Sequence, residues 1–137
     1  KAVGALNGKK VCSVQGSTSV DNIKAKASSA DILALDTYSA CVQAMKDGRV
    51  EAVSTDNVIL LGFAIQDQSL KMVGGLFTDE PYGIGVKQGK KDFQKFIDDT
   101  LARMFSDGTW DRIYDQYLGK YGLPAAKESR EKLPAAP

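Results

Sequence analysis

A short turn rich in glycine and hydroxyl groups, residues 16–19, is the part of this sequence best suited to chemistry. It follows residues 11–15, which are short and apolar enough for a buried strand, and a helical pattern begins behind it. Ser17 or Thr18 is a natural N-cap for that helix. Such a turn directs free backbone N–H groups and the positive end of the helix dipole outward, which favours an anion. The same residues also suit an ordinary strand-to-helix connection.

Asp56 is the second candidate, because it follows Thr55 at the end of another predicted strand. The carboxyl ends of parallel strands lie at one edge of a sheet, and ligands bind there. If the two strands are neighbours, an anion cradle at Gln15, Gly16, Ser17 and Thr18 faces a carboxylate. This pairing suits a small zwitterion, with its carboxylate in the turn and its ammonium on Asp56. The alternative is that Asp56 only caps the following helix.

The composition restricts the classes of function. The chain has 137 residues, a formal net charge of +1 and no histidine. This length fits one domain with a real core. Near-neutral, mixed charge argues against nucleic acid or an anionic membrane as the main partner. Without histidine, the Ser-His-Asp and Cys-His nucleophile systems and most zinc sites are excluded, and an enzyme would have to work with Asp, Glu, Lys, Tyr or Cys alone. We expect a binding protein and not an enzyme, with no metal and no cofactor.

The two cysteines, Cys12 and Cys41, are either buried free thiols or a disulfide. Cys12 lies on the first predicted strand and Cys41 on a helix that should pack against the sheet, so a bridge is geometrically plausible. We favour the disulfide, which would imply an oxidising compartment. The spacing matches no redox or metal motif.

Hydrophobic patterning predicts an α/β chain. Strands are expected at residues 11–15, 32–35, 50–55 and 71–74, with helices at about 19–27, after Thr37 and after Asp56. This alternation predicts a parallel sheet with right-handed crossovers. A further strand is expected at residues 82–86.

The second half of the chain should form two helices. Each carries an apolar stripe, and we interpret the aromatic side chains as core rather than as a ligand platform. The first stripe is Phe93, Phe96, Ile97 and Leu101, and the second is Trp110, Ile113, Tyr114, Tyr117 and Leu118. Residues 124–137 have almost nothing to bury and should be a tail.

The order of several short segments resembles the second lobe of bacterial extracellular solute-binding proteins for polar amino acids. The segments are LNGKKV at residues 6–11, VQGSTS at 14–19, YSACVQAMKDGRVEAV at 38–53, TD at 55–56, EPYGIGV at 80–86 and DGTW at 107–110. With both cysteines present, the chain looks most similar to the glutamate- and glutamine-type lipoproteins. The resemblance implies one lobe of a type II periplasmic-binding fold, with parallel-rich sheet, flanking helices and two C-terminal helices.

The resemblance also implies roles. Residues 1–80 would be the ligand-binding lobe, residues 81–123 a segment that completes the first lobe, and residues 124–137 a tail. The turn at Gly16, Ser17 and Thr18 would hold the α-carboxylate and Asp56 the α-ammonium. Some members read the ligand side chain with a lysine where Gln15 or Gly16 stands, so the preference between acidic and amide ligands is open.

As implied by the resemblance, the protein would be the passive binding component of an amino-acid ABC importer. It would bind glutamate, aspartate or glutamine outside the cell, deliver it to a membrane permease, and be lipid-anchored through a part not in this chain. The chain would be a fragment lacking most of the first lobe, with possible self-association. The alternatives are a sensor or receptor domain and, with a poor supply of acids and bases, a lyase.

Overall fold

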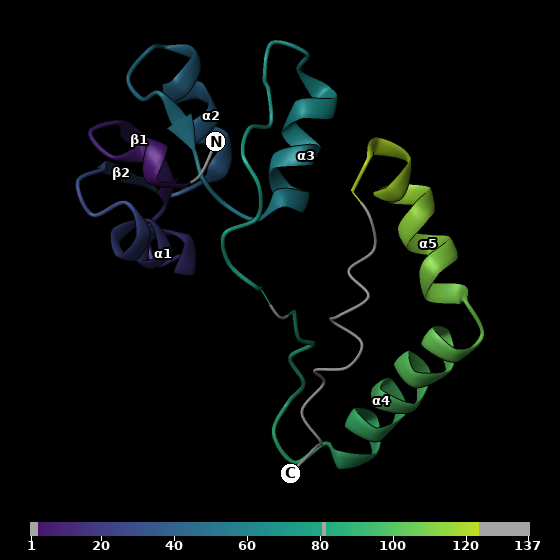
Figure 1. Ribbon diagram of the computed structural model, residues 1–137. Helices are drawn as coiled ribbons and strands as arrows, with labels where there is room; N and C mark the ends of the chain where they lie inside the picture. Colours follow the sequence, from purple (N-terminus) through teal and green to yellow (C-terminus); the bar gives the residue numbers. More distant parts are fainter. Residues whose placement is uncertain (1–2, 81, 124–137) are drawn as a thin grey trace. The chain divides into compact units, whose positions relative to one another are not determined.

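The computed structural model describes residues 3–80 and 82–123, which belong to two compact units divided after Glu80. The first unit, coloured from purple to teal in Figure 1, contains a parallel sheet in the order β2-β1-β3. Its strands are β1 (Lys10–Val14), β2 (Asp31–Leu35) and β3 (Ala52–Val53). A short 3-10 helix, Val3–Leu6, precedes the sheet. The expected parallel α/β arrangement is confirmed.

Strand β1 is central and buried on both faces. Val11 packs with Ile23 and Ala27 of the α1 side, whereas Cys12 packs with Cys41 and Ala44 of the α2 side. Neighbouring residues of a strand point to opposite faces, so α1 (Thr18–Lys26) and α2 (Tyr38–Lys46) cover opposite faces of the sheet. The chain crosses from β1 to β2 and then back past β1 to β3. Because both crossovers are right-handed, α1 and α2 must lie on opposite faces.

Hydroxyl side chains begin both of these helices. The Ser17 side chain accepts a hydrogen bond from the Ser19 N–H, and the Thr37 side chain accepts one from the Ala40 N–H, each at 3.1 Å. These contacts satisfy N–H groups that a helix cannot pair internally. Helix α1 therefore starts one residue earlier than expected. Helix α3 (Asn57–Gln66) follows β3 and buries Leu61.

A disulfide joins the central strand to α2. Cys12 and Cys41 are bonded, with their Cα atoms 5.4 Å apart, and both residues are fully buried. The expected bridge is thus confirmed. It lies within the same small core as Ala44 and Val50, so it fastens α2 to the sheet where apolar packing also holds it.

The second unit contains the two expected helices, α4 (Lys91–Ser106) and α5 (Thr109–Tyr117), followed by a 3-10 turn at Gly119–Tyr121. Gly108 separates α4 from α5 with φ of 75°, a left-handed conformation that glycine adopts without steric cost. The rings of Phe105 and Trp110 contact each other across this junction, with centroids 5.0 Å apart.

Two expected strands are wrong. Residues 71–74 and 82–86 form no ladder with any described residue and have no regular secondary structure. A strand needs a hydrogen-bonded neighbour, and apolar residues beside glycine do not supply one. Val73 and Ile84, which a strand would bury on one face, are 77% and 61% exposed. Strand β3 is also shorter than the expected 50–55.

The expected core role of the aromatic stripes is not observed either. None of the described residues of α4 and α5 is buried, and Phe93, Phe96 and Tyr117 are each more than half exposed. The stripes form as amphipathic faces, but the unit does not cover them. The tail expected at residues 124–137 lies outside the described residues.

Removing the disulfide should destabilise the first unit. The two cysteines are separated by 29 residues, and closing a loop of this length contributes about 3.5 kcal/mol on the chain-entropy model. We therefore expect the double variant Cys12→Ala/Cys41→Ala to lose about 2–4 kcal/mol of unfolding free energy, measured by urea denaturation. Reduction of the unchanged chain serves as the control. A loss below about 1 kcal/mol, or two alkylated thiols in the unreduced folded chain, would contradict the bridge.

Candidate functional site

The carboxyl edge of the sheet, where all three strands end, brings the predicted site residues together. Strands β1 and β3 are direct neighbours, with Cys12 paired to Val53. Beyond this pair, the Ser54 N–H donates to the Cys12 carbonyl at 3.0 Å, and the buried Ser13 hydroxyl donates to the Ser54 carbonyl at 2.8 Å. The segments that contain β1 and β3 therefore stay side by side up to the residue before Thr55, as the zwitterion hypothesis requires.

The turn after β1 is built to present hydrogen-bond donors. Gly16 has φ of 77° and nothing lies within 4 Å of the position of a Cβ there, so the turn needs glycine for its backbone conformation and not for space. The Gln15 N–H donates to the Leu35 carbonyl at 2.9 Å, which anchors the turn to β2. Among the described residues, the N–H groups of Gly16 and Thr18 have no acceptor. Together with the positive end of α1, they suit an anion.

Asp56 lies at the N-cap position of α3, but its side chain makes no capping hydrogen bond. The alternative interpretation of Asp56 as a helix cap therefore lacks the contact that it requires. The residue is half-buried. Before it, Thr55 Oγ1 is buried and has no hydrogen-bond partner in the described part of the chain. A buried hydroxyl without a partner typically costs about 1–3 kcal/mol, and here that cost falls at the carboxyl edge.

Tyr38 is a further residue at this edge that the sequence patterns did not assign to the site. It begins α2, directly after β2 has ended, and its hydroxyl donates to Ser17 Oγ at 3.1 Å. The end of β2 thus joins the ends of β1 and β3 in one group. The sequence could have indicated Tyr38 through its position, because polar residues that follow a parallel strand lie at this edge.

Carboxyl groups with shifted pKa values lie elsewhere. The Lys9 ammonium hydrogen-bonds Glu51 and holds the pKa of that carboxyl below its usual value, at the opposite edge of the sheet. Lys46 and Ser69 lower the pKa of Asp67 in the same way, and the Thr109 backbone N–H lowers that of Asp107. These are exposed ion pairs and caps, so the shifts indicate local pairing and not an acid–base pair at the carboxyl edge.

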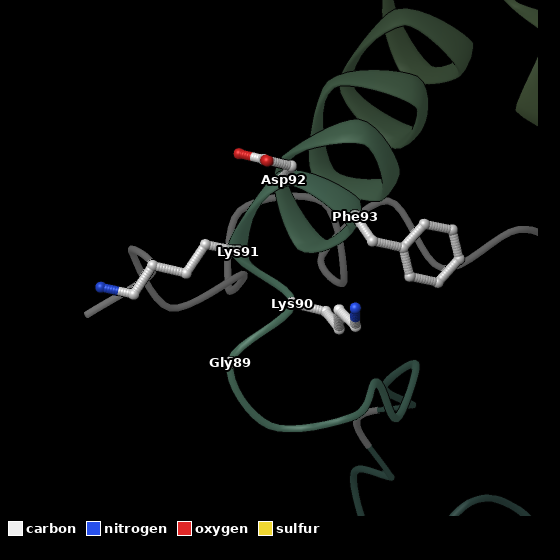
Figure 2. Close-up of a pocket in the computed structure, with 5 residues that line it drawn as sticks. All are labelled: Gly89, Lys90, Lys91, Asp92 and Phe93. Carbon is white, nitrogen blue, oxygen red and sulfur yellow. The ribbon is translucent and has the colours of Figure 1, made fainter.

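Two shallow hollows of the surface do not coincide with the predicted site. One, of about 470 Å³, surrounds the start of α4 at residues 89–93. Figure 2 shows the side chains of Lys90, Lys91 and Asp92 extending in different directions, so these polar groups do not converge. The other, of about 360 Å³, is lined by Lys10, Asp31 and Arg49 at the edge where the strands begin. We interpret both as surface bends.

The described residues contain no group of three or more histidine, cysteine, aspartate or glutamate side chains placed to hold a metal ion. Within the same residues, no helix has the length and hydrophobicity that crossing a membrane demands.

Known proteins with similar sequences are amino-acid-binding components of ABC transporters. The chain is 43% identical over 111 residues to the ABC transporter glutamine-binding protein GlnH of Bacillus subtilis, covering 81% of this chain and 41% of the relative. It is 38% identical over 120 residues to the glutamate-binding protein GluB of Corynebacterium glutamicum, covering 83% and 41%. The chain therefore spans about two fifths of the length of these relatives. No protein-family model matches it.

Solved structures give the same fold. An ancestral arginine-binding protein bound to glutamine superposes with a TM-score of 0.75 and 39% identity, covering 87% of this chain and 54% of that one. The ancestral amino-acid-binding protein AncCDT-1, described as a precursor of cyclohexadienyl dehydratase, superposes at 0.73 with 27% identity, covering 85% and 51%. The chain has the α/β fold of one lobe of a type II periplasmic-binding protein.

Proposed function

We propose that this chain, whose homologues are the solute-binding proteins of amino-acid ABC transporters, binds a polar amino acid at the carboxyl edge of its sheet. The observation that carries the proposal is the pairing of β1 with β3, because the donor-rich turn at residues 16–18 follows β1 and Asp56 lies three residues after the end of β3. The ligand α-carboxylate would accept from the Gly16 and Thr18 N–H groups and the Ser17 hydroxyl. Its ammonium would donate to Asp56.

Glutamine and glutamate are the favoured ligands, because the two relatives are a glutamine-binding and a glutamate-binding protein, and aspartate is a further candidate. Gln15, which is exposed beside the turn, is positioned to contact the ligand side chain. Gln15 offers both a donor and an acceptor, so this position accommodates an amide and a carboxylate alike. Thr55 would contribute to the same edge through its backbone or through the unpartnered hydroxyl.

The protein would act without chemistry of its own, as a binding component that delivers its ligand to a membrane permease. The matched relatives are binding proteins, and the carboxyls with shifted pKa values lie away from the edge. It would work outside the cell, where the Cys12–Cys41 disulfide is stable. By its resemblance to the binding lipoproteins, the full-length protein would carry a lipid anchor.

Ligand binding should depend on the charge of Asp56. In a two-lobed protein that carries this chain, we expect Asp56→Ala or Asp56→Asn to cost about 2–5 kcal/mol of binding, because the ammonium loses its charged partner. Isothermal calorimetry with glutamine and glutamate measures the loss. Thr18→Ala should cost less, because the backbone N–H contacts remain.

The matched control is Asp36→Asn, which removes a carboxylate from the end of β2 at the same edge. This variant should bind almost as the unchanged protein does. An Asp56→Ala variant whose affinity stays within threefold of the unchanged protein would remove Asp56 from the site.

The 137-residue chain alone should bind weakly and self-associate. A single lobe offers half of the contacts, and charge pairs that face solvent contribute little. We expect dissociation constants in the millimolar range. The exposed apolar faces of α4 and α5, with Phe93 and Phe96 at 54% and 64% exposure, should be covered by a second copy.

Sedimentation velocity combined with calorimetry tests both parts of this expectation. Replacing Phe96 by serine should shift the chain toward the monomer, whereas replacing the exposed Lys24 of α1 by serine should not. Micromolar binding by a strictly monomeric sample would contradict the half-site argument.

A further inference from the structure

The contact between Tyr38 and Ser17 connects two helix starts at the carboxyl edge. The Tyr38 hydroxyl donates to Ser17 Oγ at 3.1 Å, although the residues are 21 positions apart in the chain. Both side chains are half-buried. A phenol is a stronger acid than an aliphatic alcohol, so the proton of this hydrogen bond belongs on the tyrosine side, with serine as acceptor.

Ser17 Oγ consequently receives two hydrogen bonds. One comes from Tyr38, and the other comes from the Ser19 N–H at 3.1 Å. A serine hydroxyl can accept two hydrogen bonds and donate one. Both acceptor positions of the Ser17 hydroxyl are therefore used inside the chain. This hydroxyl can make one further hydrogen bond, in which it donates its own proton.

Several features of the fold hold Tyr38 in place. Thr37 caps α2 immediately before it, through the Ala40 N–H. Cys41, three residues further along α2 and close to the same helix face, is tied by the disulfide to Cys12 of β1. Ser17 lies in the turn that follows that same strand. The buried disulfide and the cap of α2 therefore hold the two hydroxyls close to each other.

We propose that Tyr38 is a positioning residue of the ligand-binding turn, which makes the Ser17 hydroxyl a donor and thereby selects a carboxylate over a carboxamide. This inference rests on the proposed function. The three groups proposed to hold the α-carboxylate, the Ser17 O–H and the N–H groups of Gly16 and Thr18, are then all donors. A carboxylate accepts at both oxygens, whereas a carboxamide would direct its own NH₂ group at one of these donors.

Without the Tyr38 hydroxyl, Ser17 Oγ recovers an acceptor position. The serine can then accept from a carboxamide as readily as it donates to a carboxylate. Two effects on binding follow. A ligand with an α-carboxylate binds more weakly, and the preference for an α-carboxylate over an α-carboxamide decreases. If Tyr38 only supported the fold, removing its hydroxyl would weaken the binding of both ligands equally.

The test titrates the 137-residue chain, labelled with ¹⁵N, with L-glutamine and separately with the α-carboxamide of L-glutamine. The amide signals of Gly16, Thr18 and Ser19 report binding at the turn. The variants are Tyr38→Phe, Ser17→Ala and the double variant. The matched control is Tyr117→Phe, which removes the hydroxyl of a tyrosine that is 62% exposed on α5. Thermal unfolding shows whether each variant remains folded.

We expect Tyr38→Phe to weaken glutamine binding about threefold to tenfold and to reduce the ratio of the two affinities by a similar factor. Ser17→Ala should have a similar effect, and the double variant should be no weaker than Ser17→Ala, because the two side chains act through one hydroxyl. Tyr117→Phe should change neither affinity.

Two results would overturn the inference and leave the proposed function intact. One is glutamine binding within 1.5-fold of the unchanged chain in Tyr38→Phe. The other is an equal loss for both ligands, which would indicate a structural role. If the unchanged chain showed no amide shifts with glutamine at ~100 mM, far above the millimolar range of weak binding, both the inference and the proposed function would be rejected.

Discussion

The burial of strand β1 on both faces is the constraint on which the rest of the first unit depends. Val11, Cys12 and Ser13 are fully buried, so the strand must have a neighbour on each side and a helix over each face. Parallel neighbours reach back to the same edge through crossover helices. Once β1 is central, the turns that follow all three strands must therefore meet at one edge.

The polar contacts at that edge follow from the same arrangement. Ser13 is buried and polar, and its hydrogen bond to the Ser54 carbonyl keeps the end of β3 against β1. The disulfide of Cys12, on the opposite face of the strand, holds α2 and thereby Tyr38. Ser17 receives hydrogen bonds from both Ser19 and Tyr38. The proposed site is thus held in place by the Ser13–Ser54 hydrogen bond and by the disulfide, neither of which is proposed to contact the ligand.

Local sequence patterns predicted those parts of the structure that local interactions determine. The strand expected at residues 11–15 is observed at Lys10–Val14, and the disulfide joins the expected pair of cysteines. The N-cap of α1 is Ser17, one of the two hydroxyl residues considered for that position. The apolar segments at residues 71–74 and 82–86 looked equally suited to strands. They are not strands because a strand forms only with a paired neighbour, and the described sheet provides none for them.

The same limit applies to the candidate site. The meeting of the strand ends at one edge was predictable, because the alternation of strands and helices is visible in the sequence. The zwitterion site at that edge stays a prediction. The hydrogen bond between Tyr38 and Ser17 was not predictable, since it joins residues that only the folded sheet brings together. The exposure of Phe93 and Phe96 could not be predicted from the sequence either. An amphipathic stripe shows which face of a helix is apolar but not what covers that face.

The most direct test of the account is a map of where a polar amino acid contacts the chain. Adding L-glutamine to the ¹⁵N-labelled chain should shift the amide signals of residues 16–19 and 55–57 most, with little change at residues 89–93. This result would place the ligand at the carboxyl edge of the sheet. Shifts concentrated at residues 89–93, or at the opposite edge near Lys10 and Arg49, would contradict the account.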